Sequence, residues 1–208
     1  MIDFTLTETD QAVLDYTRAG ALLCRKHARY YDENEHEMAP EVLPEAEAFY
    51  AETPRPPAAG PEDTSQPVML ALHTMIQHWG DYTVRLKRSG GGLGNAALAA
   101  AGTPEQQAKW GGLVLSMAIT EPGCGSDPSR GSTSAVLDEE TDEWVINGEK
   151  IFVTTGIRAD AAVIWATLDK SAGRAGIKSF LVEKGTPGFD VPHKEKKLGI
   201  RADDTAAY

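Results

Sequence analysis

The sequence predicts an α+β fold, in which an all-helical N-terminal domain is followed by an antiparallel β-barrel or sandwich domain. Up to residue 112, apolar residues recur at the spacing of amphipathic helices. From residue 113 onward the apolar period changes to two, and short apolar runs alternate with turn residues. We therefore expect two domains, a helical one over 1–112 and a strand-rich one over 113–208. A chain of 208 residues with 41% hydrophobic residues is long enough to give each domain a buried core.

Helix start signals mark the first domain. Thr7 precedes two acidic residues, which is typical of an N-cap followed by a helical first turn. Thr103 precedes a proline and stands three residues before Gln106, which predicts a capping box. Helices are expected over Thr7 to about Tyr31, Pro44–Ala51, 68–80 and 104–110.

The second domain has seven short runs with strand character. The dipeptide Asn147-Gly148 separates two of these runs and favours a type I′ hairpin, because that turn needs positive φ at both central residues. The expected strands are Leu113–Thr120, Ser132–Asp138, Glu143–Ile146, Lys150–Thr154, Ala161–Thr167, Lys178–Glu183 and Phe189–Pro192.

One glycine pattern suggests a different cofactor. The segment Gly92–Ala97 fits the Gly-x-Gly-x-x-Ala pattern of nicotinamide-dinucleotide folds. However, the preceding run Tyr82–Arg88 carries charge at alternate positions, whereas a central parallel strand is almost wholly apolar. Seven strands then follow without a helix long enough for a crossover. We therefore do not expect a nicotinamide-binding fold.

Composition narrows the class of partner. A net charge of −11 disfavours nucleic acid, because a nucleic-acid binder needs a basic stripe to displace counterions from phosphates. No run approaches the roughly 18 apolar residues of a membrane span, and the N-terminus lacks the features of a signal peptide, so a cytoplasmic protein is expected. Two cysteines, Cys24 and Cys124, are too few for a disulfide framework, and no metal site is expected.

The most informative segment is Ala118–Asp127, Ala-Ile-Thr-Glu-Pro-Gly-Cys-Gly-Ser-Asp. We expect Gly123 and Gly125 to permit backbone conformations closed to other residues. Thr120 and Ser126 would add hydroxyls beside the freed backbone N–H groups, and such a concavity suits a pyrophosphate. The same residues are also compatible with a plain connection between a strand and a turn capped by Ser and Asp.

A second segment, Asn147–Gly156, reads Asn-Gly-Glu-Lys-Ile-Phe-Val-Thr-Thr-Gly. Together the two segments resemble the acyl-CoA dehydrogenase family, whose middle domain carries Thr-Glu-Pro-Gly-x-Gly-Ser-Asp and then Asn-Gly-x-Lys-x-Trp-Ile-Thr-Asn-Gly. A third segment, Lys197–Thr205, is similar to the family's Lys-x-Gly-x-Arg-x-Ser-Asp-Thr. The resemblance covers the N-terminal helical and middle β domains only. It implies a truncated acyl-CoA dehydrogenase-like fold in which the C-terminal helical domain is missing.

The resemblance implies FAD as the cofactor and assigns its contacts position by position. Thr120 matches the threonine that hydrogen-bonds the pyrimidine side of the isoalloxazine ring. Ser126 matches the serine on the FAD pyrophosphate and is also a candidate substrate contact. Thr154 matches the threonine beside flavin N5. The expected cofactor-binding residues are Ala118, Ile119, Thr120, Gly125, Ser126, Phe152, Val153 and Thr154.

The implied reaction is α,β-dehydrogenation of an acyl-CoA thioester, a step of fatty acid β-oxidation. In the family a carboxylate removes the α proton while flavin N5 accepts the β hydride, and that carboxylate comes from the C-terminal helical domain. No catalytic residue is therefore expected in this chain, and the base is expected beyond Tyr208. Glu121 belongs to the Thr-Glu-Pro turn and is expected to be structural. Alone, the chain is expected to be an inactive fragment, because positioned proton transfer commonly contributes about 10²–10⁴-fold.

Three positions depart from the family pattern. Arg130 stands where the first motif usually ends in Gly, Ala or Ser. Phe152 replaces the usual tryptophan, which keeps an aromatic face but loses the indole N–H. Asp203 replaces a serine and places a second carboxylate beside Asp204, which leaves the local hydrogen bonding open.

Other functions remain open. The chain is also compatible with a non-catalytic partner subunit of a hetero-oligomeric dehydrogenase, or with a flavin oxidase or monooxygenase of the same superfamily. The resemblance further implies acyl-CoA as the substrate, electron transfer flavoprotein as the electron acceptor, and a homo- or hetero-oligomer at full length.

Overall fold

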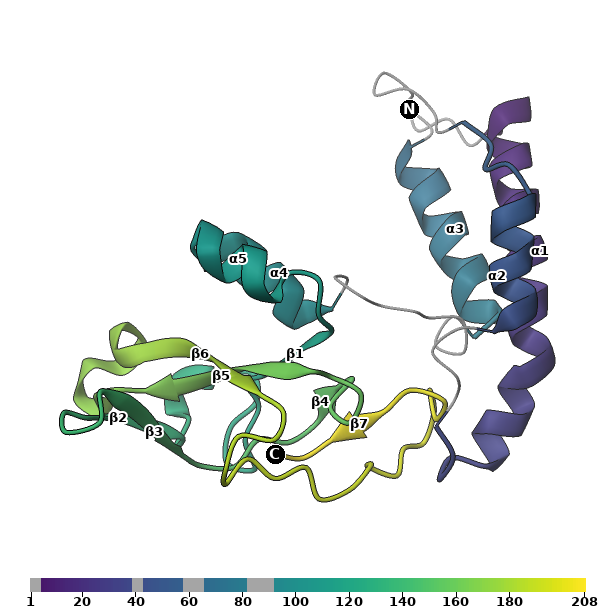
Figure 1. The fold of residues 1–208 in the computed structure, drawn as a ribbon. Coiled ribbons are helices and arrows are strands. Elements are labelled where there is room, and N and C mark those ends of the chain that lie inside the picture. Colours follow the sequence, from purple (N-terminus) through teal and green to yellow (C-terminus); the bar gives the residue numbers. More distant parts are fainter. Residues whose placement is uncertain (1–4, 39–42, 58–65, 82–91) are drawn as a thin grey trace. The chain divides into compact units, whose positions relative to one another are not determined.

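The computed structural model describes residues 5–38, 43–57, 66–81 and 92–208 (Figure 1). Contacts group the chain into two compact units, 1–87 with 197–203 and 88–196 with 204–208. The segment 197–203 therefore belongs to the helical unit, although the residues on both sides of it belong to the other unit. None of the helices in the described ranges is both long and apolar enough to span a membrane.

Within these ranges, the first unit contains the helices α1 (Glu8–Glu33), α2 (Pro44–Glu52) and α3 (Gln66–Trp79). Thr7 caps α1 as the sequence predicts. Its hydroxyl accepts a hydrogen bond from the Asp10 N–H at 3.1 Å, and its own N–H donates to the Asp10 carboxylate at 2.9 Å. The predicted helices are thus confirmed, with ends that differ by one or two residues.

Helices α1 and α2 approach closely at Gly20. A Cβ at this position would lie 2.7 Å from Cζ of Tyr50, so a larger residue would require the Tyr50 side chain to move. The buried residues beside this contact form a small core to which the segment 197–203 contributes one side chain. This core consists of Cys24, Leu43, Ala46 and Ala202.

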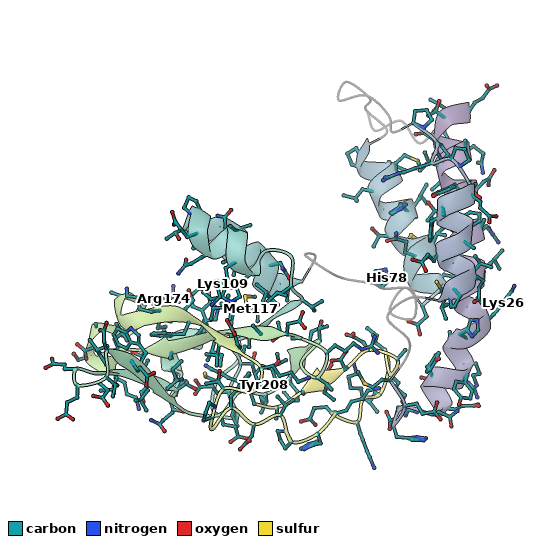
Figure 2. All side chains as sticks on the ribbon, in the orientation of Figure 1. Lys26, His78, Lys109, Met117, Arg174 and Tyr208 are labelled. Carbon is teal, nitrogen blue, oxygen red and sulfur yellow. The ribbon has the colours of Figure 1, made fainter. Side chains whose placement is uncertain are left out.

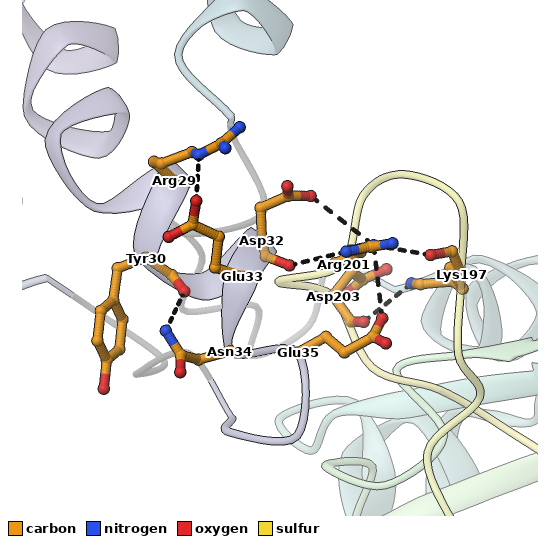
Figure 3. Close-up of polar contacts among 9 residues, drawn as sticks. All are labelled: Arg29, Tyr30, Asp32, Glu33, Asn34, Glu35, Lys197, Arg201 and Asp203. Atoms are coloured by element: carbon orange, nitrogen blue, oxygen red, sulfur yellow. Dashed lines mark hydrogen bonds and ion pairs between the residues drawn. The ribbon is translucent and has the colours of Figure 1, made fainter.

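Arg201 holds the segment 197–203 against the C-terminal end of α1 (Figure 3). Its Nε lies 3.9 Å from a carboxylate oxygen of Asp32 and 3.6 Å from one of Glu35, and its Nη1 donates to the Asp32 carbonyl at 3.2 Å. Lys197 closes the segment on itself, because its Nζ donates to the carbonyl of Asp203 at 2.9 Å. Arg201, the arginine of the third motif segment, therefore has its partners within the helical unit.

The second unit begins with α4 (Leu93–Ala101) and α5 (Pro104–Trp110). The expected capping box of α5 is present. Gln106 N–H donates to the Thr103 hydroxyl at 3.3 Å, and Thr103 N–H donates to Oε1 of Gln106 at 2.9 Å. The start and the end of this helix are as predicted.

The glycines before and within α4 permit close packing of the helix on a strand. Helix α4 packs on β1 (Leu115–Ala118), and Asn95 Oδ1 accepts a hydrogen bond from the Leu115 N–H at 3.0 Å. A Cβ at Gly94 would lie 2.7 Å from the Leu115 carbonyl oxygen. The run Tyr82–Arg88, which a nicotinamide-binding fold would need as a strand, lies outside the described residues.

The main sheet is mixed, so the expectation of an antiparallel domain is wrong. Strand β5 (Ala161–Thr167) is central. Strands β1 and β2 (Ser134–Asp138) both pair parallel along one edge of it, and β6 (Ile177–Glu183) pairs antiparallel along the other. The described strands also do not close a barrel. A period of two predicts strands but carries no information on the direction of their partners. The strands besides β1 are β2 (Ser134–Asp138), β3 (Glu143–Asn147), β5 (Ala161–Thr167) and β6 (Ile177–Glu183).

A second sheet contains two very short strands, β4 (Val153–Thr154) and β7 (Thr205–Ala206), which pair antiparallel. The predicted strand Lys150–Thr154 is reduced to β4. The predicted strand Phe189–Pro192 is wrong, because these residues carry no strand pairing. Strand β7, at two residues, is too short for an alternation pattern to reveal it.

The predicted hairpin at Asn147-Gly148 is also wrong. Asn147 is the last residue of β3, lies opposite Ser134 of β2 and does not adopt positive φ. Strand β3 pairs with β2, whereas β4 pairs with β7. Gly148 instead permits close contact, because a Cβ there would lie 2.7 Å from Cα of Thr133.

The structure groups α4 and α5 with the sheet. In α5, Trp110 Nε1 donates to the Glu183 carboxylate at 2.9 Å, and Lys109 Nζ lies 3.1 Å from the same side chain. The division expected at residue 112 follows the type of secondary structure. Contacts place the limit at residue 87 instead, because α4 packs against β1 and β5, and Trp110 and Lys109 connect α5 to β6.

Candidate functional site

The first motif segment begins where β1 ends, at Ala118. Glu121 and Cys124 close a tight turn through two backbone hydrogen bonds, of 2.9 Å and 3.1 Å. Neither Gly123 nor Gly125 adopts positive φ, so the expected special backbone conformations are not found there. A Cβ at either glycine would meet no atom within 4 Å. The glycines therefore leave the surface of this loop open.

The carboxylate of Glu121 lies beneath this loop and is 3% exposed. It accepts hydrogen bonds from Lys150 Nζ at 2.7 Å, from the Ser132 N–H at 2.5 Å and hydroxyl at 2.7 Å, and from the Thr133 N–H at 3.0 Å. Lys150 Nζ also donates to the carbonyl of Ile119 at 3.1 Å. Both charged groups of the pair thus have several hydrogen-bond partners, as buried ions require.

These contacts determine the protonation of Glu121. Burial alone would raise the pKa of its carboxyl group, but the hydrogen bonds from Lys150, Thr133 and Ser132 outweigh burial and lower the pKa from 4.5 to about 2. A carboxylate held in this way stays ionised, and its oxygens are already engaged. Glu121 therefore has the geometry of a structural group and not that of a proton acceptor.

Lys150 joins the second motif segment to the first. Besides the pair with Glu121, the next residue, Ile151, donates its N–H to the Thr120 carbonyl at 2.9 Å. Lys150 also exchanges two backbone hydrogen bonds with Tyr208, of 2.8 Å and 2.7 Å; Figure 2 labels Tyr208 at the end of the chain. From the sequence, Lys150 was expected only as part of the second motif and not as the ion-pair partner of Glu121. The available signal was that Lys150 is the one basic residue of the second motif segment.

The backbone of the second segment is strained on both sides of β4. Phe152 has φ of 59° and Thr155 has φ of 60°, in the left-handed region that residues other than glycine rarely adopt. Such conformations cost about 1–3 kcal/mol and persist only where the surrounding structure imposes them. They mark this segment as a candidate site.

Strand alternation exposes two side chains of this segment. Val153 is 1% exposed and packs with Ala118 in a buried cluster of the second unit. Phe152 and Thr154, on either side of it, are exposed, and the Phe152 side chain is 64% exposed. An aromatic ring and a hydroxyl are thus presented beside the loop that contains Thr120.

The third motif segment anchors the second. Thr155 N–H donates to the Asp204 carbonyl at 2.7 Å. The Asp204 side chain is 0% exposed and accepts hydrogen bonds from the N–H groups of Ile157 at 2.8 Å and Arg158 at 3.0 Å, with the Arg158 Nε 3.2 Å away. Asp203 belongs to the other unit. The two adjacent carboxylates therefore lie in different surroundings.

All eight expected cofactor residues lie in the second unit. Ala118 and Val153 are buried, so they can offer only backbone groups, and Ile119 and Thr120 are half-buried. Strand β4 lies against β1, which brings the residues 118–120 and 152–154 together. The exposed members of the set are Gly125, Ser126, Phe152 and Thr154.

The segments described above match a known domain. Residues 116–208 match the family model "Acyl-CoA dehydrogenase, middle domain". This part of the chain therefore resembles an acyl-CoA dehydrogenase middle domain. The short-chain specific acyl-CoA dehydrogenase of Clostridium acetobutylicum is 44% identical over 110 residues, which are 50% of this chain and 28% of that protein. The acryloyl-CoA reductase (NADH) of Anaerotignum propionicum is 41% identical over 111 residues, again 50% of this chain and 28% of that protein.

Solved acyl-CoA dehydrogenase structures resemble the chain over nearly its whole length. Butyryl-CoA dehydrogenase from Megasphaera elsdenii has a TM-score of 0.65 and 26% identity, and the match covers 99% of this chain and 56% of that one. An acyl-CoA dehydrogenase from Geobacillus kaustophilus has a TM-score of 0.64 and 27% identity, with 100% and 56% covered. The sequence matches thus cover 28% of the length of these curated relatives, and the structural matches cover 56% of the solved chains.

Proposed function

We propose that the middle domain provides the flavin-binding face of an FAD-dependent acyl-CoA dehydrogenase, which removes hydrogen from the α and β carbons of an acyl-CoA thioester. The observation that carries this proposal is the ion pair between Lys150 and Glu121. It joins the two motif segments, so that Phe152 and Thr154 are exposed beside Thr120. A site of this kind needs such positioning, because orientation of the reactants is a large part of the catalysis.

The residues present fit a flavin. The exposed ring of Phe152 offers an apolar surface for the isoalloxazine, and the hydroxyls of Thr120 and Thr154 offer hydrogen bonds to its polar edges. The open loop at Gly125 and Ser126 suits the pyrophosphate. Bound FAD would supply the hydride acceptor that no side chain can provide.

The proton acceptor of the reaction would lie elsewhere. Glu121 is engaged by Lys150, Ser132 and Thr133, so we infer no catalytic residue among the motif segments, and we expect the base from outside residues 1–208. The names of the curated relatives make a short acyl-CoA the first substrate to test. An electron transfer flavoprotein as electron acceptor and an oligomeric full-length enzyme rest on the resemblance.

Titration of the chain with FAD tests the cofactor part of the proposal. We expect flavin fluorescence to change as FAD binds, and the variants Phe152→Ala and Thr154→Val to weaken binding about 5- to 20-fold, as expected for loss of one ring contact or one hydrogen bond. Trp144→Ala removes a comparably exposed ring from β3 and serves as the matched control. Equal affinity of all variants, or preference for NAD, would contradict the proposal.

A separate assay addresses the reaction. The FAD-loaded chain is mixed with butyryl-CoA in the absence of oxygen, and the flavin absorbance is followed. The proposal expects no rapid bleaching by the 208-residue chain alone and bleaching by a protein that also supplies the base. Rapid bleaching by the chain alone would show that the base lies within it.

A further inference from the structure

The side chain of Tyr208 connects strand β1 to the turn that follows β4. Its hydroxyl oxygen lies 2.8 Å from Oγ of Ser116, a β1 residue that is 1% exposed, and the hydroxyl donates to the carbonyl of Gly156 at 2.8 Å. Gly156 is buried and lies two residues after Thr154. One phenol thus bridges the main sheet and the segment that carries a proposed flavin contact.

The direction of these hydrogen bonds follows from their chemistry. A carbonyl can only accept, so the single proton of the Tyr208 hydroxyl is directed to Gly156. The Ser116 hydroxyl then donates to the Tyr208 oxygen, a shorter contact than the 3.5 Å from Ser116 Oγ to the Ala161 carbonyl. Burial raises the pKa of the Tyr208 hydroxyl to about 12, so the phenol keeps its proton at neutral pH.

The rest of Tyr208 is fixed in place. Its backbone N–H and carbonyl both bond the backbone of Lys150, at 2.7 Å and 2.8 Å. Its ring meets the ring of Phe189 edge to face, with 4.9 Å between centroids, and packs on the buried cluster that contains Val153. A hydroxyl on so well-held a ring can position the group to which it donates.

The turn after β4 needs such support, because its backbone is strained. Thr155 has φ of 60°, a conformation that persists only where surrounding contacts impose it. Asp204 holds the N–H groups of this turn: its carbonyl accepts from Thr155 at 2.7 Å, and its carboxylate accepts from Ile157 and Arg158 at 2.8 Å and 3.0 Å. Tyr208 supplies the complementary bond, to a carbonyl of the same turn.

We propose that Tyr208 is a positioning residue of the flavin face. Through the Gly156 carbonyl, its hydroxyl holds the turn after β4 in the geometry that presents Thr154 beside Thr120. The inference rests on the proposed function, because it takes Thr154 as a flavin contact. The sequence does not reveal this role, since Tyr208 lies outside the three motif segments and 92 positions from Ser116.

Tyr208→Phe removes the hydroxyl and leaves the ring and the backbone contacts. NMR order parameters of the ¹⁵N-labelled chain measure motion within the folded state, so a change in overall stability does not move them. We expect the order parameters of amides 154–157 to fall from about 0.85 toward 0.6, and those of β5 to stay unchanged. Tyr30→Phe removes a hydroxyl bonded to Glu37 at 2.9 Å in the helical unit, and this matched control should change neither group.

Titration with FAD connects the turn to the cofactor. We expect Tyr208→Phe to weaken FAD binding about 5-fold, as for the loss of one hydrogen bond. If Tyr208 acts through Thr154, the double variant Thr154→Val/Tyr208→Phe should bind FAD no more weakly than Thr154→Val alone. Losses that multiply would show that the two residues act independently, and they would overturn the positioning role.

Ser116→Ala tests the first hydrogen bond of this chain. It removes the donor to Tyr208 but leaves the bond from the phenol to Gly156. We expect the same effects as for Tyr208→Phe at smaller size, and no added effect when Ser116→Ala is combined with Tyr208→Phe. If Tyr208→Phe does not fold, Ser116→Ala carries the comparison with Thr154→Val.

The positioning role and the proposed function fail separately. If the unaltered chain binds FAD and Tyr208→Phe binds it equally well with unchanged order parameters, the positioning role is overturned and the proposed function stands. If the unaltered chain binds no FAD, the proposed function fails. The order parameters then still decide whether Tyr208 holds the turn, because no flavin is present in that measurement.

Discussion

Lys150 and Glu121 form a buried ion pair, with 2.7 Å between Nζ and Oε1 and side-chain exposures of 5% and 3%. The pair connects two segments that lie 29 positions apart in the chain. Since neither ion is accessible to water, each depends on the other for compensation of its charge. The integrity of the proposed flavin face is therefore coupled to the free energy of unfolding of the second unit.

Lys150→Met tests this coupling. The substitution leaves the Glu121 carboxylate buried without its ion, so we expect the free energy of unfolding to fall by about 3–5 kcal/mol. Urea denaturation followed by circular dichroism measures the loss. The double variant Glu121→Gln/Lys150→Met should recover part of it, and a double variant as unstable as the sum of both single variants would contradict the pairing.

Acid should destabilise the domain through the same carboxylate. The pKa of Glu121 is about 2 in the folded chain and 4.5 ordinarily, so its contribution to stability is fully present above pH about 4.5 and is lost as the pH falls through about 2. The difference corresponds to about 3 kcal/mol. Urea midpoints measured between these pH values should decline less steeply for Glu121→Gln. An identical decline in the variant would assign the acid sensitivity to other groups.

Phe152→Asn should separate stability from cofactor binding. Asparagine tolerates the left-handed backbone that Phe152 adopts, so we expect the free energy of unfolding to rise by about 0.5–1 kcal/mol, while FAD binds more weakly because the ring is lost. Thermal unfolding and FAD titration measure the two effects. Asp142→Asn, at a position with φ of 56° in the turn between β2 and β3, should change neither. A variant that loses stability would show that the ring contributes more than the strain costs.

Gly94→Ala sets helix propensity against packing. Alanine at the second residue of α4 would gain at most about 1 kcal/mol from propensity. Its Cβ, however, would lie 2.8 Å from the backbone carbon of Leu115, which β1 holds in place, so we expect a net loss of at least about 2 kcal/mol. Gly112→Ala, where a Cβ meets no atom within 4 Å, is the control and should be close to neutral. Equal stabilities of the two variants in urea would mean that α4 can shift on the sheet.

Arg201→Gln should act locally. The Arg201 side chain is 34% exposed, and solvent screens its ion pairs with Asp32 and Glu35, so we expect a loss of only about 1 kcal/mol. Hydrogen exchange should nevertheless become faster at the amides of residues 197–203, because the guanidinium also bonds the carbonyls of Asp32 and Lys197. Unchanged exchange there would show that Ala202 alone holds the segment.

Local signals made the helices predictable. The hydroxyls of Thr7 and Thr103 each accept a hydrogen bond from the N–H of the third residue of the helix that follows. Both partners lie within four consecutive residues, so the contact can be predicted from the local sequence. The strands Ala161–Thr167 and Lys178–Glu183 were also found, because their apolar residues repeat within a single run. The α+β class and the limits of α1, α2, α3 and α5 therefore follow from short-range physics, whereas the expected antiparallel barrel or sandwich was wrong.

Long-range pairing was not predictable in the same way. The alternation in Leu115–Ala118 indicates a strand, but its parallel partner, β5, begins more than forty positions later. The hairpin predicted at Asn147-Gly148 is wrong because Gly148 is needed for close contact with Thr133. The sequence does not distinguish a glycine needed for such a contact from one needed for a turn. Of the candidate site, the residue types followed from the motifs, whereas the ion pair that joins Lys150 to Glu121 is visible only in three dimensions.

The return of residues 197–203 to the helical unit has a practical consequence. Neither unit is a continuous stretch of chain, so a fragment that begins at residue 113 would carry Arg201 and Ala202 without the partners they have in α1 and its neighbours. Conversely, a protease cut between residues 81 and 92 would not by itself release the helices, because the segment would continue to bind them as a tethered ligand. The nicked protein would behave as a two-chain complex whose affinity measures how strongly that segment is bound.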